Sequence, residues 1–270
     1  MATVKEIYRL IDEFAPFETQ MDFDNAGFLA GRSGQEVSRV LVSLDITQTA
    51  AEEAVRRGCQ LIVSHHPVIF GGVKSVTDET VTGRVLLTLA ENSLSAICAH
   101  TNLDAAQGGV NDCLAQCLGL SGAVLLEQGG IDRKGRPYGI GRVGMAHRAG
   151  LSAAEYAAYV KKQLNANSLR YEDAGVPVGR VAVGGGSCGS MLEQVRAAGC
   201  DTFITADVKY DVFLSARAMG INLLDAGHYA TENVVCPMLV ELISDAFPQV
   251  EVLLSCDHRE VYQGCVTGSP

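Results

Sequence analysis

The chain has 270 residues, of which 47% are hydrophobic and 19% are charged, and its formal net charge is −10 at pH 7. This composition predicts an ordered globular protein with an ample apolar core and excludes a largely disordered chain. The acidic balance, without a long cluster of Lys and Arg, argues against nucleic acid as the main partner. It leaves room for a small anionic ligand, because the local charge of a site can oppose the net charge.

No apolar run approaches the length of a membrane-spanning helix, so we expect no association with a membrane. The first residues form an amphipathic helix pattern, with Ile7, Leu10, Ile11 and Phe14 on one face, and lack the features of a signal peptide. The nine cysteines are scattered without any C-x-x-C. That distribution is typical of reduced core residues, and we expect a cytoplasmic protein.

Short apolar runs alternate with amphipathic stretches along the chain, which is the pattern of an α/β fold. The predicted strands are Val40–Leu44, Gln60–Ser64, Ala96–Ala99, Val181–Gly184, Thr202–Thr205 and Asn222–Asp225. The predicted helices between them are Thr49–Arg57, Thr82–Asn92, Val110–Leu118, Ala153–Asn165 and Ser190–Ala198. The segment Glu127–Arg136 is rich in glycine and charge and predicts a boundary between two linked α/β lobes, residues 1–127 and 128–270. The C-terminal part of the second lobe could pack back on the first.

An internal repeat relates the two halves of the chain. The segment that starts at Arg39 (RVLVSLD) aligns without gaps with the segment that starts at Arg180 (RVAVGGG), with the same order of strand, helix and strand. After a gap, the stretch ICAHTNLD, which ends at Asp104, matches LDAGHYATE, which ends at Glu232. Each half therefore carries a histidine four residues before a carboxylate, directly after a strand, and we infer a duplicated α/β unit.

Imidazole and carboxylate side chains follow three of the predicted strands, where ligands of open α/β sheets bind. They are His65 and His66 after the first, His100 and Asp104 after the second, and His228 and Glu232 after the third. Neighbouring side chains of an extended segment point to opposite sides, so His65 and His66 would serve two ions, or one would bind while the other orients. If the chain turns helical after Gly227, His228 and Glu232 stand one turn apart on one helix face. His100 and Asp104 would do the same in a helical turn.

This donor set of imidazole and carboxylate without thiolate suits zinc, iron(II), manganese, nickel or cobalt. A catalytic zinc usually takes three protein ligands, and the number of candidates here exceeds that, which predicts two divalent ions. Two such ions with two carboxylates leave a local charge of roughly +2, which favours a phosphate or another anion as the ligand. Each residue also has a simpler interpretation: a hydrogen-bonded structural histidine, a helix cap or a solvated acid.

Six stretches resemble a known family: DNAGF at Asp24–Phe28, SLD at Ser43–Asp45, SHHPVIF at Ser64–Phe70, HTNLDAAQGGVND at His100–Asp112, VAVGGGSCG at Val181–Gly189 and DAGHYATE at Asp225–Glu232. They resemble the GTP cyclohydrolase I type 2 homologues, also called Nif-three-like dinuclear-metal hexamers, over about residues 4–248. The resemblance implies two linked α/β lobes with a dinuclear metal site between them, and a ring-shaped homohexamer. It implies the metal ligands His65, His66, Asp104, His228 and Glu232, with His100 close by.

One stretch departs from the pattern of the family. Family members commonly read Thr-Gly-Asp followed shortly by a Tyr-His pair, whereas this chain reads TADVKYD, with Ala206 and Asp211. No role of a histidine can therefore be transferred to position 211. The repeat places Asp207 opposite His66, which keeps Asp207 as a candidate to support the ligands from outside. We predict that His100 or Asp207 carries a proton in catalysis.

Three further features each allow two interpretations. The turn Gly184–Ser190 could present N–H groups to a phosphate, or it could be a plain strand-to-helix turn, which the missing Gly-Lys-Ser/Thr favours. The DNAGF motif could form a wall of a pocket or simply a turn. His147 and His258 have no partner motif, and we expect them to be surface or packing residues.

We expect a dinuclear metal-dependent hydrolase that acts on a nucleotide or a related phosphorylated heterocycle. The resemblance implies opening of the purine ring of GTP with release of formate. Two other functions stay open: a metal-handling protein, such as a chaperone or store whose ions are cargo, and a hexameric scaffold whose metals staple its lobes. Freely exchanging metal would indicate a metal-handling protein. A strong loss of melting temperature on metal removal, without any substrate being found, would indicate a scaffold.

Overall fold

The computed structural model describes residues 2–264 and divides them into two compact units. Unit 1 consists of residues 2–106 and 235–259, and unit 2 of residues 107–234 and 260–264. The sequence predicted one boundary, between residues 127 and 128. In the structure, the chain first leaves unit 1 and enters unit 2 earlier, after Ala106. The physical reason is helix α5 (Val110–Cys117), which packs against strands β10 (Arg142–Met145) and β12 (Arg180–Val183) of unit 2.

Unit 1 is built on a five-stranded sheet with the strand order β15-β4-β5-β6-β2. Its strands are β2 (Gly27–Ala30), β4 (Arg39–Ser43), β5 (Leu61–Ser64), β6 (Ser95–Cys98) and β15 (Glu251–Leu254). Strands β15, β4, β5 and β6 run parallel, and β2 pairs antiparallel with β6. A separate antiparallel pair joins β1 (Ala2–Thr3) to β3 (Glu36–Val37).

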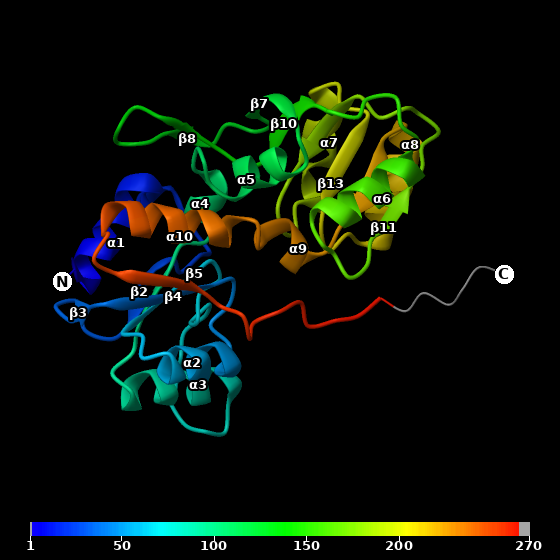
Figure 1. Cartoon of the computed structure of the whole chain (residues 1–270). Helices are drawn as coiled ribbons and strands as arrows, with labels where there is room; N and C mark the ends of the chain where they lie inside the picture. Colours follow the sequence, from blue (N-terminus) through cyan, green and yellow to red (C-terminus); the bar gives the residue numbers. More distant parts are fainter. Residues whose placement is uncertain (1, 265–270) are drawn as a thin grey trace. The chain divides into compact units, whose positions relative to one another are not determined.

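Helices cover both faces of this sheet (Figure 1). The helices of unit 1 are α1 (Val4–Phe14), η1 (Phe17–Thr19), α2 (Gln48–Arg56), α3 (Val81–Glu91), α4 (Thr101–Ala105) and α10 (Val235–Ala246). Helices α2 and α3 pack on one face, and α10, which contacts α1, lies against β15 and β4 on the other. Leu41, Ile62 and Ala96 lie in one buried cluster with residues of α2 and α3. Because side chains alternate along a strand, the neighbouring apolar residues point to the opposite face, so the strands are apolar on both sides.

Unit 2 has a six-stranded sheet with the order β11-β14-β13-β12-β10-β7. Besides β10 and β12, its strands are β7 (Ser121–Leu125), β11 (Arg170–Glu172), β13 (Thr202–Thr205) and β14 (Asn222–Asp225). Strands β12, β13 and β14 are parallel, and the remaining neighbours pair antiparallel. A small antiparallel pair joins β8 (Gly130–Ile131) to β9 (Pro137–Tyr138).

Two apolar clusters cover the two faces of the unit 2 sheet. Besides α5, the helices of this unit are α6 (Ala153–Gln163), η2 (Gly189–Met191), α7 (Leu192–Ala197), α8 (Tyr210–Met219) and α9 (His228–Glu232). Val181 and Ile204 pack with residues of α5 and α6, whereas Ala182 and Phe203 pack with residues of α7 and α8. The alternation along β12 and β13 thus builds a sheet covered by helices on both sides.

The predicted α/β fold is confirmed, and the predicted duplication is visible in the topology. The order β4-α2-β5-α3-β6-α4 in unit 1 corresponds to β12-α7-β13-α8-β14-α9 in unit 2. Val40 pairs with Leu61 in the first repeat, and Val181 pairs with Thr202 at the equivalent positions of the second. The helix predicted over Ser190–Ala198 begins as the 3-10 turn η2 before α7. Among the described residues, no helix is long and apolar enough to cross a membrane.

Candidate metal centre

His65 follows β5 directly, and its side chain is completely buried. Its Nδ1 lies 2.8 Å from the carbonyl oxygen of Ala99, the residue after β6. A carbonyl oxygen can only accept a hydrogen bond, so Nδ1 carries the proton and Nε2 carries the lone pair. Nε2 lies 3.6 Å from Oδ1 of Asp104. The parallel pairing of β5 and β6 therefore fixes both the tautomer and the direction of this ring.

His66 is held in the same way by a carboxylate. Its Nδ1 lies 2.8 Å from Oδ1 of Asp45, which follows β4. Burial alone would raise the pKa of Asp45, but hydrogen bonds from His258 and His66 hold that pKa well below its ordinary value. Asp45 is therefore an ionised acceptor, so Nδ1 of His66 donates, and in the neutral ring Nε2 carries the lone pair.

His100 is the N-cap residue of α4 and is held by the DNAGF motif. Its Nδ1 lies 2.7 Å from Oδ1 of Asp24, and the backbone N–H and hydroxyl of Thr101 donate to the other oxygen of Asp24. Burial opposes ionisation of Asp24, yet these hydrogen bonds keep its pKa well below the ordinary value. Asn25 ties the motif to the loop after the histidine pair by donating to the carbonyl of Ile69 at 2.6 Å. The DNAGF motif thus orients His100. The two interpretations from the sequence, a pocket wall or a turn, did not include this role.

The three imidazoles of unit 1 form one cluster. His65, His66 and His100 each offer a ring nitrogen, and these three atoms lie within 4.8 Å of one another. The ring centroids of His65 and His66 are 4.9 Å apart, and those of His65 and His100 are 5.2 Å apart. With Asp104 beside His65, unit 1 therefore brings together three imidazoles and one carboxylate. The predicted ligands among them, His65, His66 and Asp104, are called the unit 1 ligand set.

His228 and Glu232 form the corresponding set in unit 2. His228 is the first residue of α9, and its Nε2 lies 2.9 Å from Oε2 of the buried Glu232 one turn later. The one-turn geometry predicted after Gly227 is thus confirmed. Two ligands of one tetrahedral ion, each at roughly 2.0–2.1 Å from it, lie about 3.3 Å apart. The 2.9 Å here and the 3.6 Å between His65 and Asp104 bracket that spacing.

Asp207 contacts His228 and supports it from outside. Its Oδ2 lies 2.6 Å from Nδ1 of His228, and 56% of its side chain is exposed. Its backbone has φ +51, in the left-handed region that Asp tolerates better than most residues. Asp211, where the chain departs from the family, lies exposed in the first turn of α8. Asp207 therefore orients a candidate ligand, in keeping with the supporting place expected for it, and its part in proton transfer stays a prediction.

The Gly-rich turn of unit 2 uses its N–H groups within the protein. Gly185 donates to Oδ1 of Asn111 at 2.9 Å, and Gly186 donates to Oγ1 of Thr231 at 3.1 Å. Gly186 has φ +65, and a Cβ there would lie 2.1 Å from Oε1 of Glu232. These contacts favour the plain strand-to-helix turn over a phosphate site, and they show that the glycine makes room for Glu232.

His258 is neither a surface residue nor merely a packing residue, which corrects the expectation from the sequence. It is 8% exposed, and its Nε2 lies 2.8 Å from Oδ2 of Asp45, the carboxylate that also holds His66. His147, by contrast, is exposed as expected. No local motif marks His258, because it lies 213 positions along the chain from Asp45.

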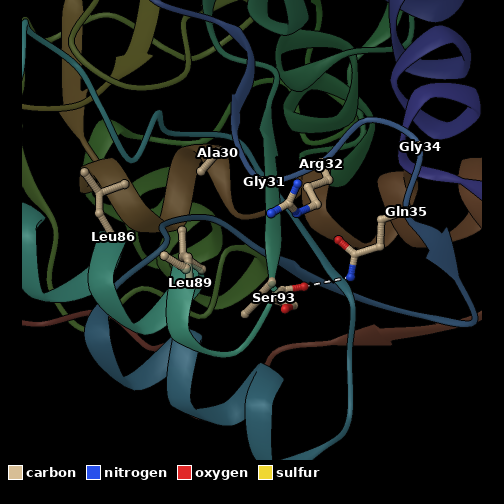
Figure 2. A pocket seen from close by; sticks show the side chains of 10 residues that line it. Ala30, Gly31, Arg32, Gly34, Gln35, Leu86, Leu89 and Ser93 are labelled. Atoms are coloured by element: carbon tan, nitrogen blue, oxygen red, sulfur yellow. Dashed lines mark hydrogen bonds between the residues drawn. The ribbon is translucent and has the colours of Figure 1, made fainter.

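A cavity of about 750 Å³ lies elsewhere in unit 1, between the end of β2 and α3 (Figure 2). Leu86 and Leu89 provide apolar lining, and Arg32 and Gln35 line the polar part, where Gln35 donates to the carbonyl of Ser93 at 2.7 Å. None of the candidate metal ligands lines it. The cavity is therefore not part of the candidate metal centre.

Comparisons with known proteins agree with the motifs and the fold. A Streptomyces coelicolor protein named GTP cyclohydrolase 1 type 2 homolog is 40% identical over 243 residues, which cover 88% of this chain and 84% of that protein. A Clostridium perfringens protein of the same name is 29% identical over 262 residues, or 96% of this chain and 98% of that one. A solved structure of a Staphylococcus aureus hypothetical protein superposes with a TM-score of 0.90 at 28% identity, covering 97% of this chain and 99% of that one. The family model Duf34/NIF3 (NGG1p interacting factor 3) matches residues 2–260, and the chain belongs to this family.

Proposed function

We propose that this protein is a dinuclear metal-dependent hydrolase that acts on a nucleotide or a related phosphorylated heterocycle. One observation carries the proposal: four histidines each place Nδ1 within 2.6–2.8 Å of a carbonyl or carboxylate oxygen, which in a neutral imidazole leaves Nε2 with the lone pair. They are His65, His66, His100 and His228. Metal-binding histidines in proteins typically donate their other N–H in this way, which fixes the ring and raises its basicity.

The donor set fits divalent transition metals. It combines imidazole nitrogens with carboxylate oxygens at ligand-to-ligand spacings of 2.9 and 3.6 Å. Such donors suit zinc, iron(II), manganese, nickel or cobalt. As the family resemblance implies, we assign two ions to five ligands, which are His65, His66, Asp104, His228 and Glu232.

The other polar residues then have supporting tasks. Divalent ions bound here would supply Lewis-acid chemistry, by activating water and stabilising negative charge. Asp45 and Asp207 keep His66 and His228 in the tautomer whose Nε2 can bind. His100, held by Asp24, is the residue to which we assign proton transfer, at its Nε2.

The names of relatives support a nucleotide substrate. A Helicobacter pylori protein named GTP cyclohydrolase 1 type 2 is 31% identical over 243 residues, which cover 90% of this chain and 92% of that protein. A site with two divalent ions also attracts phosphate groups electrostatically. We therefore propose GTP as the first substrate to test.

Elemental analysis combined with a turnover assay tests this function. Protein purified without chelators should contain two transition-metal ions per chain, and GTP should yield formate and a new pterin-like absorbance. A chain that retains no metal and rebinds none would refute the metal centre. A second outcome is a protein that binds metal but turns over neither GTP nor a broad panel of nucleotides in any of the five metal forms. If the bound ions also exchanged freely, this result would refute hydrolysis and favour metal handling. A large loss of melting temperature on metal removal would instead indicate a scaffold.

We also propose that the chain forms a homohexamer, as the family resemblance implies. Light scattering at micromolar concentration should give about six times the chain mass of 28.6 kDa. A species at the mass of one chain would refute the hexamer without affecting the proposed metal centre.

A further inference from the structure

Asp45 is the centre of a chain of three side chains in unit 1. Its Oδ1 accepts from Nδ1 of His66 and its Oδ2 accepts from Nε2 of His258, both at 2.8 Å. Asp45 follows β4 and His66 follows β5, and these two parallel strands pair up to Ser43 and Ser64. The sheet itself therefore places Asp45 next to His66, whereas His258 comes from a distant segment of the chain.

That segment continues from the edge of the same sheet. Strand β15 pairs parallel with β4, and the backbone N–H of Ser255, the next residue, donates to the carbonyl of Val42 at 2.8 Å. The hydroxyl of Ser255 in turn accepts from the backbone N–H of His258 at 3.2 Å. The turn after β15 thus directs the His258 ring back towards Asp45.

Glu53 of α2 anchors this turn. It is 2% exposed, and its carboxylate accepts from the hydroxyl of Ser255 at 2.5 Å and from the backbone N–H groups of Cys256 at 3.1 Å and Asp257 at 3.2 Å. Burial alone would raise the pKa of Glu53, but these hydrogen bonds and that of Arg57 lower it to about 2. An ionised, buried carboxylate therefore fixes the three residues that precede His258.

We propose that His258 is a positioning residue for metal binding, which acts through Asp45 on His66. This inference rests on the proposed function, because it takes His66 to be a metal ligand. With one N–H donor on each oxygen, the Asp45 carboxylate cannot rotate without breaking a hydrogen bond. Loss of the His258 donor frees the carboxylate to rotate and weakens its hold on the His66 ring. Residues that support metal ligands in this way contribute roughly 10–100-fold to metal affinity.

Two replacements separate the hydrogen bond from packing. His258→Leu keeps a side chain of similar size but has no N–H donor, whereas the amide of His258→Gln can still donate to Asp45. His147→Ala serves as a matched control, since this exposed histidine belongs to unit 2. The probe is Co²⁺ added to the full-length, metal-free protein, followed by its visible absorption spectrum and its dissociation constant.

We expect His258→Leu to weaken Co²⁺ binding by about 10-fold or more and to change the visible spectrum. His258→Gln should restore most of the affinity, and His147→Ala should bind like the wild type. Equal losses in the Leu and Gln variants, or wild-type affinity and spectrum in the Leu variant, would overturn the positioning role alone. A wild-type protein that binds no Co²⁺ or other divalent metal would overturn the proposed metal centre, and this inference with it. If the Leu variant does not fold, the Gln variant together with the NMR signal of a slowly exchanging Nε2–H of His258 in the wild type decides the same question.

Discussion

The two repeats use the same strand–helix frame but present the histidine–carboxylate pair differently. In unit 2, His228 and Glu232 lie on one helix face with Nε2 and Oε2 2.9 Å apart. In unit 1, His100 is the N-cap of α4, outside the helix, and Asp104 lies beside His65 instead. The expectation that His100 and Asp104 form a one-turn pair therefore does not describe their geometry.

One inserted residue accounts for this difference. Unit 2 has Gly227 between the strand and the histidine, and its φ of +88 is accessible to glycine. The extra residue lets His228 begin the helix, so that the acid four positions later lies on its face. In unit 1 the histidine takes the capping position, with φ −109 and ψ −110, and binds Asp24 instead.

The supporting residues have also exchanged places between the repeats. In unit 1, Asp45 at the end of β4 supports a histidine at the end of β5. The equivalent positions of unit 2 are Gly186 and Asp207, and there the residue after the second strand supports His228. The duplicated frame thus fixes where polar residues can meet, while single substitutions decide which of them binds and which supports.

Removing one ligand from each set should have the largest effect. His228→Ala and Asp104→Ala should each lower the metal content below two ions per chain, because each removes one of the five ligands that we assign to the two ions. We expect affinity losses above the roughly 10–100-fold seen for supporting residues, and loss of any turnover. Elemental analysis after dialysis measures the content, with His147→Ala as the control. If one variant kept both ions, the two sets would not be equivalent as metal ligands.

Gly186→Ala should remove the room that unit 2 makes for Glu232. A Cβ there would lie 2.1 Å from Oε1 of Glu232, so the carboxylate must move and metal affinity should fall by at least about 10-fold. Gly175→Ala is the matched control in the same unit, because Gly175 has φ +74 but nothing within 4 Å of a new Cβ. Both should lose roughly 1–2 kcal/mol of stability to backbone strain. Equal Co²⁺ affinities in the two variants would show that Glu232 does not need the glycine.

Asp45→Asn and Asp207→Asn compare the two supporting carboxylates. Each keeps a carbonyl oxygen that can accept from the histidine but loses the charge, so both should weaken metal binding by about 10-fold. The loss should be larger at Asp45, which accepts two N–H donors, than at Asp207, whose side chain is 56% exposed and accessible to water. Asn at position 207 tolerates the positive φ, so no strain complicates the result. Isothermal titration with Zn²⁺ measures both variants, and a larger loss at Asp207 would reverse this ranking.

The parallel core strands could be predicted from the sequence, whereas the edge strands could not. Val181 and Ile204 belong to apolar runs buried on both faces, a pattern that local composition reveals. The edge strand β7 (SGAVL) also carries apolar residues but is largely exposed, and its place depends on pairing with β10.

The same limit applies to the site. The histidines follow predicted strands, so their convergence could be inferred from topology within each repeat. Asp24 contacts His100 from 76 positions away along the chain, and His258 contacts Asp45, which holds His66, from 213 positions away. No local sequence pattern reveals such contacts. The contact of Asp24 depends on the antiparallel edge strand β2, and that of His258 depends on the return of the chain through β15.

The smallest expected effect concerns stability and again contrasts the repeats. Glu53 of unit 1 is buried and anchors the turn before His258, whereas the equivalent residue of unit 2 is Gln194, whose amide makes one long, exposed contact of 3.5 Å. Glu53→Gln therefore gives unit 1 the residue that unit 2 has. The folded-state pKa of Glu53 is lowered from 4.5 to about 2, so its ionised form stabilises the fold.

That stabilisation should be fully present above the unfolded pKa of 4.5 and should vanish as the pH falls through about 2. At pH 7, Glu53→Gln should lower the free energy of unfolding of the metal-free protein by about 1 kcal/mol, because the amide keeps an acceptor oxygen and solvent weakens the effect of the charge. The difference from wild type should shrink steadily below pH 4.5. Urea unfolding at pH 7, 5 and 3.5 measures this, with Glu52→Gln as the control, since Glu52 is an exposed neighbour in the same helix. A difference that stays constant with pH would mean that Glu53 acts by packing and not by its charge. The anchor of the His258 turn would then be steric.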